Sequence, residues 1–175
     1  MVRDIVVYPD KRLKLVSKKV ESFDSELHTL LDDMYDTMMA KGGVGLAAIQ
    51  IGVDKQVLII NIPKEDAPED NQQPKENTLE MINPTILESE GSEKSQEGCL
   101  SVPGVYEDVT RAKRVKVNYC DRDGVEHTIE DDGFLAIAMQ HEIDHLNGKL
   151  FIEKLSIVKR KKFEKEWKKR AKKKK

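Results

Sequence analysis

The most restrictive feature of the sequence is an apolar stretch, residues 133–147, that carries two histidines and an acid. It reads GFLAIAMQHEIDHLN and is followed by Gly148, a residue that often ends helices. Because the stretch is apolar on nearly every side, it predicts a central buried helix. His141 and His145 would lie on one face of that helix, with about 6 Å between their Cβ atoms. With Glu142 beside them as a base, they form the two-ligand half of a metal site.

A metal would also explain why polar side chains interrupt this helix. Gln140, His141 and Glu142 follow one another there, and burying them without partners would cost several kcal/mol. The alternative is a pair of packed, hydrogen-bonded histidines, since the short HExxH pattern also arises by chance.

The third ligand has three candidates. A metalloprotease pattern that continues after HExxH needs a third histidine where this chain has Phe151. Another class takes a downstream glutamate, but Glu164 lies in a lysine-rich tail that is poorly suited to burying a ligand. Cys99, in the segment EGCLS, remains, and a deprotonated cysteine is a strong ligand for iron, zinc or nickel. A free cysteine can also be simply a small buried residue, and this description fits Cys120 better than Cys99.

The remaining chain predicts an α+β fold, with short antiparallel strands around the central helix and further helices near both termini. The N-terminal helix has a stripe of apolar residues at helical spacing and a capping residue, Asp24 or Ser25. That stripe consists of Leu27, Leu30, Leu31, Met34 and Met38. The expected strands are 56–61, 114–120 and 125–130, the last two as a hairpin across a turn at 121–124. The polar segment 64–78 is expected to be a solvated, mobile loop.

Charge is distributed unevenly between the body of the chain and its C-terminal end. Residues 159–175 contain twelve Lys or Arg and two Glu, a net charge of +10, so the rest carries −12 against −2 for the whole chain. We therefore expect a catalytic domain at 1–158 and a basic helix or tail at 159–175. Leu155, Val158, Phe163 and Trp167 fall on one helical face and could dock part of this tail.

Two cysteines and no long apolar segment favour a cytoplasmic protein without a membrane partner. No secretory leader is expected at the N-terminus.

Three motifs, in order, resemble those of the peptide deformylases: GVGLAAIQ from residue 43, EGCLS from residue 97 and QHEIDHLNG from residue 140. The resemblance implies the peptide deformylase fold and removal of the formyl group from N-formylmethionyl nascent polypeptides, with release of formate. It implies that Cys99, His141 and His145 bind one divalent metal and that Glu142 carries the proton. Fe²⁺ is expected as the native metal, with Zn²⁺, Ni²⁺ or Co²⁺ as substitutes.

The same resemblance implies that Gln50 and the backbone N–H of Leu100 stabilise the charge that develops on the formyl oxygen. The peptide is expected to pair as an added strand with this chain. The residues implied in binding its backbone and its methionine side chain are Gly43, Val44, Gly45, Gly98 and Ile137.

Two other functions compete with this interpretation. One is an HExxH zinc metallopeptidase, and the other is a ribosome-associated binding protein whose metal is structural. A structural zinc would need a fourth ligand, for which His127 or Cys120 are the nearby residue types. The basic tail suits a phosphate-rich ribosome surface in either an enzyme or a binding protein, without sequence-specific nucleic-acid recognition, although it could equally be a solubility tail.

Overall fold

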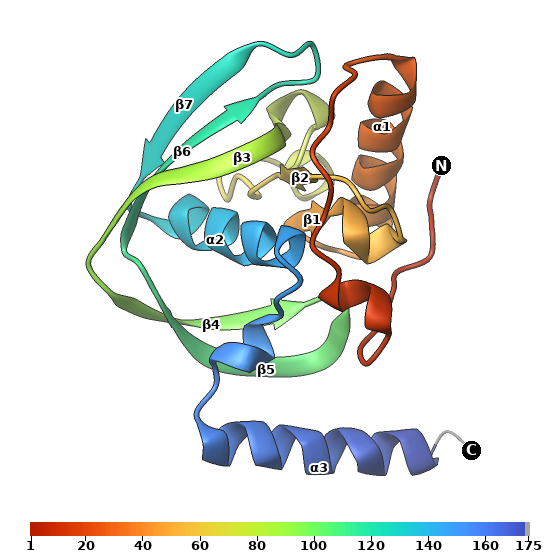
Figure 1. Cartoon of the computed structure of the whole chain (residues 1–175), viewed down its shortest axis with the longest axis vertical. Helices are drawn as coiled ribbons and strands as arrows, with labels where there is room; N and C mark the ends of the chain where they lie inside the picture. The colour runs from red at the N-terminus through yellow and green to blue at the C-terminus, as the bar shows by residue number, and fades with distance from the viewer. Residues whose placement is uncertain (174–175) are drawn as a thin grey trace.

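The computed structural model describes residues 1–173 and contains two sheets and three α-helices (Figure 1). The helices are α1 (Ser25–Ala40), α2 (Phe134–Leu146) and α3 (Ile157–Lys173). An antiparallel sheet of five strands has the order β1-β2-β3-β6-β7, and β4 pairs with β5 in a separate hairpin. The strands are β1 (Gly45–Ala47), β2 (Val57–Ile60), β3 (Leu79–Glu90), β4 (Glu93–Cys99), β5 (Val102–Arg111), β6 (Arg114–Cys120) and β7 (Glu126–Asp131).

Side chains alternate along the strands and build a core on each face of the larger sheet. Val57 and Ile59 of β2 pack toward α1, whereas Leu58 and Ile60 pack toward α2. This period of two is what a strand buried on both faces requires. Helix α2 therefore lies in the interior between the large sheet and the β4–β5 hairpin, as Figure 1 shows. The expected α+β fold around a central helix is confirmed.

Both expected helices form where their sequence patterns place them. Asp24 caps α1 by accepting a hydrogen bond from the backbone N–H of Leu27, and the predicted apolar stripe is buried. Helix α2 ends just before Gly148, whose φ of +72° is the left-handed conformation that glycine adopts most easily. A Cβ at Gly148 would lie 2.4 Å from the carbonyl oxygen of Lys14, so glycine also allows the N-terminal segment to approach.

The strands differ from the sequence prediction in number and length. Strands 56–61, 114–120 and 125–130 appear as β2, β6 and β7, but β1, β3, β4 and β5 were not predicted. The expectation of short strands is wrong for β3 and β5, which have 12 and 10 residues. Much of β3 and β4 is exposed, so neither strand has the regular apolar alternation that reveals a strand in a sequence.

Two further expectations need correction. The segment 64–78 is not simply solvated, because Gln73 and Pro74 make hydrogen bonds to α1 and to the chain near β1 and β2. Of the residues expected to dock the tail, Leu155 just before α3 and Phe163 within it are buried against the body, but Val158 is 79% exposed and does not dock. Helix α3 begins at Ile157, close to the expected boundary at 158, although the division into two domains stays a prediction.

Among residues 1–173, no helix is long and apolar enough to cross a membrane.

Candidate active site and metal centre

A cleft of about 830 Å³ opens between α2, the segment around β1, and the β4–β5 hairpin. Every residue that the resemblance implies in catalysis, substrate binding or metal binding lines this cleft, except His145, which lies deeper and is 1% exposed. The lining members of that set are Gly43, Val44, Gly45, Gln50, Gly98, Cys99, Leu100, Ile137, His141 and Glu142. Three motifs that are far apart in the sequence therefore meet at one site.

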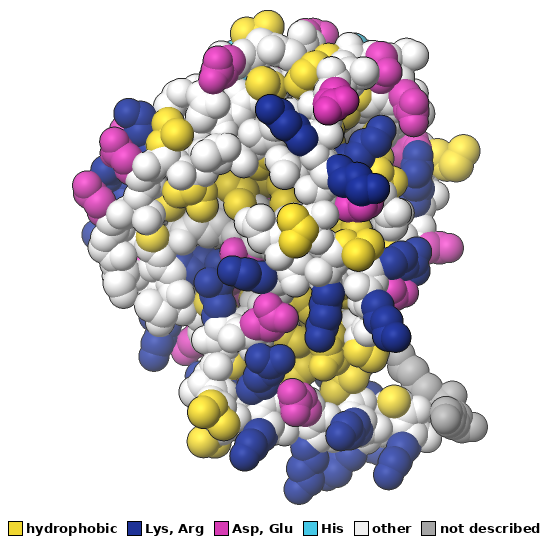
Figure 2. All heavy atoms as spheres, viewed as in Figure 1, with side chains coloured by type: hydrophobic (Ala, Val, Ile, Leu, Met, Phe, Trp, Pro, Cys, Tyr) yellow, Lys and Arg dark blue, Asp and Glu magenta, His cyan; other side chains and the backbone are white. Residues whose placement is uncertain are grey.

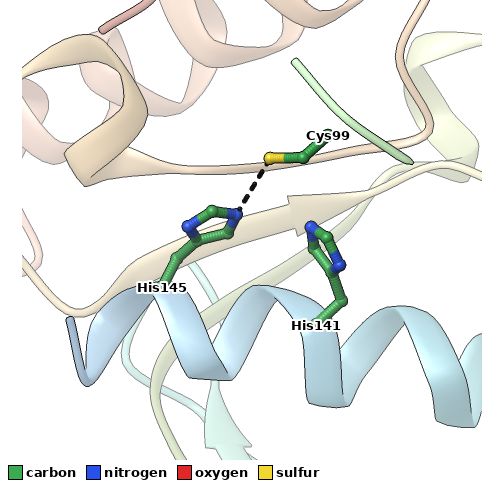
Figure 3. A group of neighbouring side chains, drawn as sticks. All are labelled: Cys99, His141 and His145. Carbon is green, nitrogen blue, oxygen red and sulfur yellow. Dashed lines mark hydrogen bonds between the residues drawn. The ribbon is translucent and has the colours of Figure 1, made fainter. Parts of the chain in front are cut away.

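Cys99, His141 and His145 bring three ligand atoms together at the inner end of the cleft. One atom from each residue lies within 4.8 Å of the other two (Figure 3). The Cys99 Sγ atom is 3.4 Å from His145 Nε2, close to the roughly 3.5 Å that tetrahedral bonds of about 2.3 and 2.0 Å would impose. One sulfur and two imidazole nitrogens suit iron, zinc, nickel or cobalt. These residues therefore fit a catalytic metal with three protein ligands.

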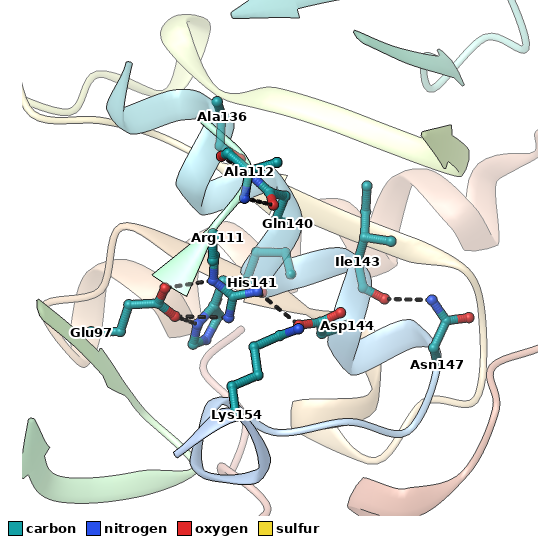
Figure 4. A network of polar contacts seen from close by, with 11 residues as sticks. Glu97, Arg111, Ala112, Ala136, Gln140, His141, Ile143, Asp144, Asn147 and Lys154 are labelled. Atoms are coloured by element: carbon teal, nitrogen blue, oxygen red, sulfur yellow. Dashed lines mark hydrogen bonds and ion pairs between the residues drawn. The ribbon is translucent and has the colours of Figure 1, made fainter. Parts of the chain in front are cut away.

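A buried polar network binds the ring of His141 through its Nδ1 atom (Figure 4). Its Nδ1 donates to Glu97 Oε1 over 2.8 Å, which leaves Nε2 for a metal. Arg111 donates to both carboxylate oxygens of Glu97 and, over 2.8 Å, to Asp144. The side chains of Arg111 and Glu97 are 2% and 6% exposed, so this ion pair is shielded from water.

Protonation in the site reflects burial and neighbouring charge. Burial raises the pKa of Glu142 to about 7, which is a suitable value for a proton carrier near neutral pH. Burial alone would lower the pKa of His141, but Cys99 and Glu97 raise it to about 10. A divalent cation bound to these atoms would displace that proton. The pKa of His145 is lowered well below its usual value by burial and by His141.

Gln50 lies in a short 3-10 helix (Ala48–Ile51), not at a strand end, and its side chain is fixed at both ends. Its Oε1 accepts from the backbone N–H of Ala47 over 2.9 Å. Its Nε2 donates to Ser101 Oγ over 3.1 Å and lies 3.5 Å from Cys99 Sγ. An amide donor is therefore held beside the cysteine.

Two glycines let neighbouring groups approach the backbone of the cleft. A Cβ at Gly45 would lie 3.0 Å from Glu142 Oε1, and one at Gly98 would lie 2.5 Å from the ring of Tyr106. Gly45 therefore makes room for the carboxylate, and Gly98 makes room for an aromatic wall of the cleft.

Sequence reasoning missed the residues that support the site. The sequence prediction assigns no role to Glu97, Arg111, Asp144 and Ser101, although Glu97, Ser101 and Asp144 lie inside the quoted motifs. Charged residues within a buried motif are a usable signal, because such groups need partners. Arg111 has no comparable sequence signal. His127, considered as a structural zinc ligand, is instead hydrogen-bonded to Asp121 on the surface.

Comparison with known proteins agrees with this geometry. The profile of the family described as Polypeptide deformylase matches residues 2–161. The chain belongs to the peptide deformylase family. A peptide deformylase of Wolinella succinogenes is 58% identical over 166 residues, which cover 95% of each chain.

Solved structures give the same result. The crystal structure of a peptide deformylase from Legionella pneumophila superposes with a TM-score of 0.88 at 43% identity, covering 100% of this chain and 99% of that one. The Ehrlichia chaffeensis peptide deformylase in complex with actinonin gives a TM-score of 0.86 at 43% identity, covering 97% of both chains. The chain is therefore a metal-dependent hydrolase that removes the formyl group from nascent peptides.

Proposed function

We propose that deformylation takes place at Cys99, His141 and His145, with Glu142 as the group that moves the proton. A divalent metal held by the three ligands would supply Lewis acidity toward the formyl oxygen and toward water. Glu142 accepts a proton from the attacking water and later delivers it to the leaving amine, so that formate and a free N-terminus are released. The observation that carries this role is the placement of Glu142, 5% exposed beside His141 and facing the cleft. Within residues 1–173 its Oε2 has no hydrogen-bond partner.

Gln50 and Leu100 would stabilise the negative charge that builds on the formyl oxygen. The Nε2 of Gln50 lies beside Cys99, and Leu100 begins the two-residue turn between β4 and β5 directly after that cysteine. A preorganised donor of this kind contributes about 3–4 kcal/mol to transition-state stabilisation.

The peptide backbone would add as a strand between β1 and β4. In the described residues, β1 pairs only with β2, and β4 pairs only with β5, so each strand has an open edge. We assign Val44 and Gly45 to one side of the peptide and Gly98 to the other. Ile137, 5% exposed, lies one turn before His141 and, with Val44, offers an apolar wall for the methionine side chain.

The test of the proton carrier is Glu142→Gln, which keeps the size of the side chain and all three metal ligands. We expect turnover of formyl-Met-Ala-Ser to fall at least about 100-fold, with unchanged metal content. The matched control is Glu153→Gln, which changes an exposed acid outside the cleft and should leave turnover near normal. Substantial activity of Glu142→Gln with metal still bound would remove Glu142 from this role.

Fe²⁺ is proposed as the native metal because thiolate and imidazole ligands accept it, with Zn²⁺, Ni²⁺ or Co²⁺ as substitutes. Metal analysis of protein purified without oxygen tests this assignment, and zinc as the sole metal in such a preparation would contradict it. A cytoplasmic location is also proposed, in keeping with two free thiols at Cys99 and Cys120.

The basic helix α3 is proposed to bind the ribosome surface, where the formylated chain emerges. Figure 2 shows Lys and Arg side chains gathered along this helix, and its apolar residues Phe163 and Trp167 pack against Tyr8 of the body. Arg170 must be kept in any test, because it donates to the backbone carbonyls of Pro103 and Gly104 in the cleft wall.

The ribosome experiment therefore replaces exposed lysines of α3 and spares Arg170. The variant carries glutamine at Lys168, Lys169, Lys172 and Lys173. Ribosome affinity should weaken and its salt dependence should flatten, while turnover of a free formylated tripeptide stays normal. Unchanged affinity at low salt would mean that these charges serve solubility alone.

A further inference from the structure

The polar segment 64–78 contains a glutamine that is hydrogen-bonded to three different parts of the molecule. The Nε2 of Gln73 donates to the backbone carbonyl of Asn61 over 2.7 Å and to that of Gly43 over 3.0 Å. The backbone carbonyl of Gln73 in turn accepts from the hydroxyl of Tyr35 in α1 over 2.8 Å. Gln73 therefore ties the loop to α1, to the end of β2 and to the wall of the active-site cleft.

Asn61 makes a second connection between the same segments. Its backbone N–H donates to the carbonyl of Val44 over 2.8 Å, and the residue is 1% exposed. Its Nδ2 donates to Pro74 O over 2.9 Å and to Thr78 Oγ1 over 3.0 Å. The loop is thus fastened at several points to the chain that leads into β1.

The segment that receives these bonds is held only in part by other backbone bonds: Gly43 N–H donates to the carbonyl of Met38 over 2.9 Å, and Gly45 pairs with Ile60 of β2. Strand β1 has three residues, and the segment leading into it contains Gly43, while the strand itself begins with Gly45. Glycine loses more backbone freedom on ordering than any other residue. Fixing one residue costs about 1–2 kcal/mol, so an unsupported edge of this kind would have to be ordered by the peptide itself.

We propose that Gln73 is a positioning residue for the substrate. By holding the carbonyl of Gly43 from outside the cleft, it fixes the edge from Gly43 to Gly45 in the conformation that pairs with the peptide backbone. Gln73 touches neither the metal ligands nor Glu142, so it acts on binding and not on the chemical step. The inference rests on the proposed addition of the peptide as a strand along this edge.

The test compares Gln73→Met with the matched control Gln72→Met in the metal-loaded enzyme. Methionine keeps the length of the side chain but removes the donor, whereas Gln72 reaches only the carbonyl of Ala67 within the same loop, over 3.5 Å. For formyl-Met-Ala-Ser we expect Gln73→Met to raise KM by about five- to tenfold, with kcat within about twofold. For formyl-methionine alone, which can make fewer backbone bonds, KM should change by less than about twofold. The control should change neither value.

A gentler variant, Tyr35→Phe, removes the hydroxyl that supports Gln73 and should change KM for the tripeptide in the same direction by a smaller factor. Hydrogen exchange supplies an independent measurement: amides of residues 43–47 should exchange faster in Gln73→Met, whereas those of α2 should not. This comparison reports the conformation of the edge even if the methionine variant is less stable.

The outcomes separate this inference from the proposed mode of binding. If the wild-type enzyme binds formyl-methionine and the tripeptide equally well, the proposed strand addition is wrong, and the positioning role of Gln73 is then also contradicted. If wild-type KM depends on peptide length but Gln73→Met leaves it unchanged, only the role of Gln73 is overturned. A fall in kcat with unchanged KM, or an equal effect of Gln72→Met, would likewise overturn it.

Discussion

Replacing Arg111 by methionine should destabilise the protein by about 3–5 kcal/mol, because the change leaves a buried carboxylate without its partner. Two nitrogens of Arg111 bind Glu97, and a third binds Asp144. Burial alone would raise the pKa of Glu97, but its bonds to His141 and Arg111 hold that pKa below its usual value. Without Arg111 the charge of Glu97 would face a low-dielectric interior with only His141 to balance it.

Arg114 provides the matched control, since it is paired with more carboxylates but lies near the surface. It bridges Glu88, Glu90 and Glu130, whose side chains are 52–69% exposed. Exposed ion pairs contribute little to stability, so Arg114→Met should destabilise the protein much less than Arg111→Met. Urea unfolding of both variants, with unchanged m-values, measures the difference.

The reasoning would be refuted if the two arginine variants lost similar stability, because the argument depends on burial and not on the number of ion pairs. A double variant gives a second check. Adding Glu97→Gln to Arg111→Met removes the unpaired charge, while the new amide oxygen can still accept from His141. The double variant should therefore regain part of the stability lost by Arg111→Met alone, and a further loss would show that charge is not the cause.

Three further predictions follow from local geometry and from metal chemistry. Gly45→Ala should lower turnover by about 10- to 100-fold with metal still bound, because its Cβ would displace the carboxylate of Glu142, as kinetics and metal analysis would show. Gly148→Ala should cost at least about 2 kcal/mol in urea unfolding, since it combines a positive φ with a clash against a backbone carbonyl. Gly42→Ala, with a φ of +68° but open space, should cost less. The nickel-loaded enzyme should survive peroxide better than the iron form, in which Cys99 oxidises, and equal inactivation rates would contradict this expectation.

The proposed reacting groups could be named from the sequence because their chemistry restricts the residue types. Metal binding at neutral pH calls for cysteine, histidine or carboxylate side chains, and few of these interrupt apolar segments in this chain. His141 and His145 stand at helical spacing, and Cys99 stands in its own motif. The resemblance to a family then supplied roles that spacing alone left open, above all for Gln50 and Leu100.

The strands of the hairpin β4–β5 could not be found in the same way. Strand β4 reads EKSQEGC and buries only Glu97, so it has no apolar face to detect. It is held by backbone pairing with β5, a type of bond that every residue except proline can make as a donor. Gln73 was missed for a related reason, since its partners are backbone carbonyls whose positions depend on the fold.

In helix α2, supporting residues and proposed metal ligands belong to one motif. Gln140 and Asp144 are four residues apart and therefore form a stripe along the helix. Gln140 exchanges two hydrogen bonds with the backbone of Ala112, over 3.0 and 2.8 Å, and Asp144 binds Arg111. Both contacts reach the end of β5, so this stripe fastens the helix to the hairpin.

The histidines occupy the adjacent stripe of the same helix, displaced by one residue, and face the other end of the hairpin. Cys99 lies at the end of β4, next to the turn that leads into β5. The way in which the neighbouring stripe holds the hairpin therefore contributes to the distance between the cysteine sulfur and the two imidazoles, together with the bonds of Glu97 to His141 and of Gln50 beside Cys99. In QHEIDH, Gln140 and Asp144 help to hold the hairpin in the position in which His141 and His145 could share one metal with Cys99. A sequence pattern reveals His141 and His145 by their chemistry. The roles of Gln140 and Asp144 could be recognised only once β5 had been placed against the helix.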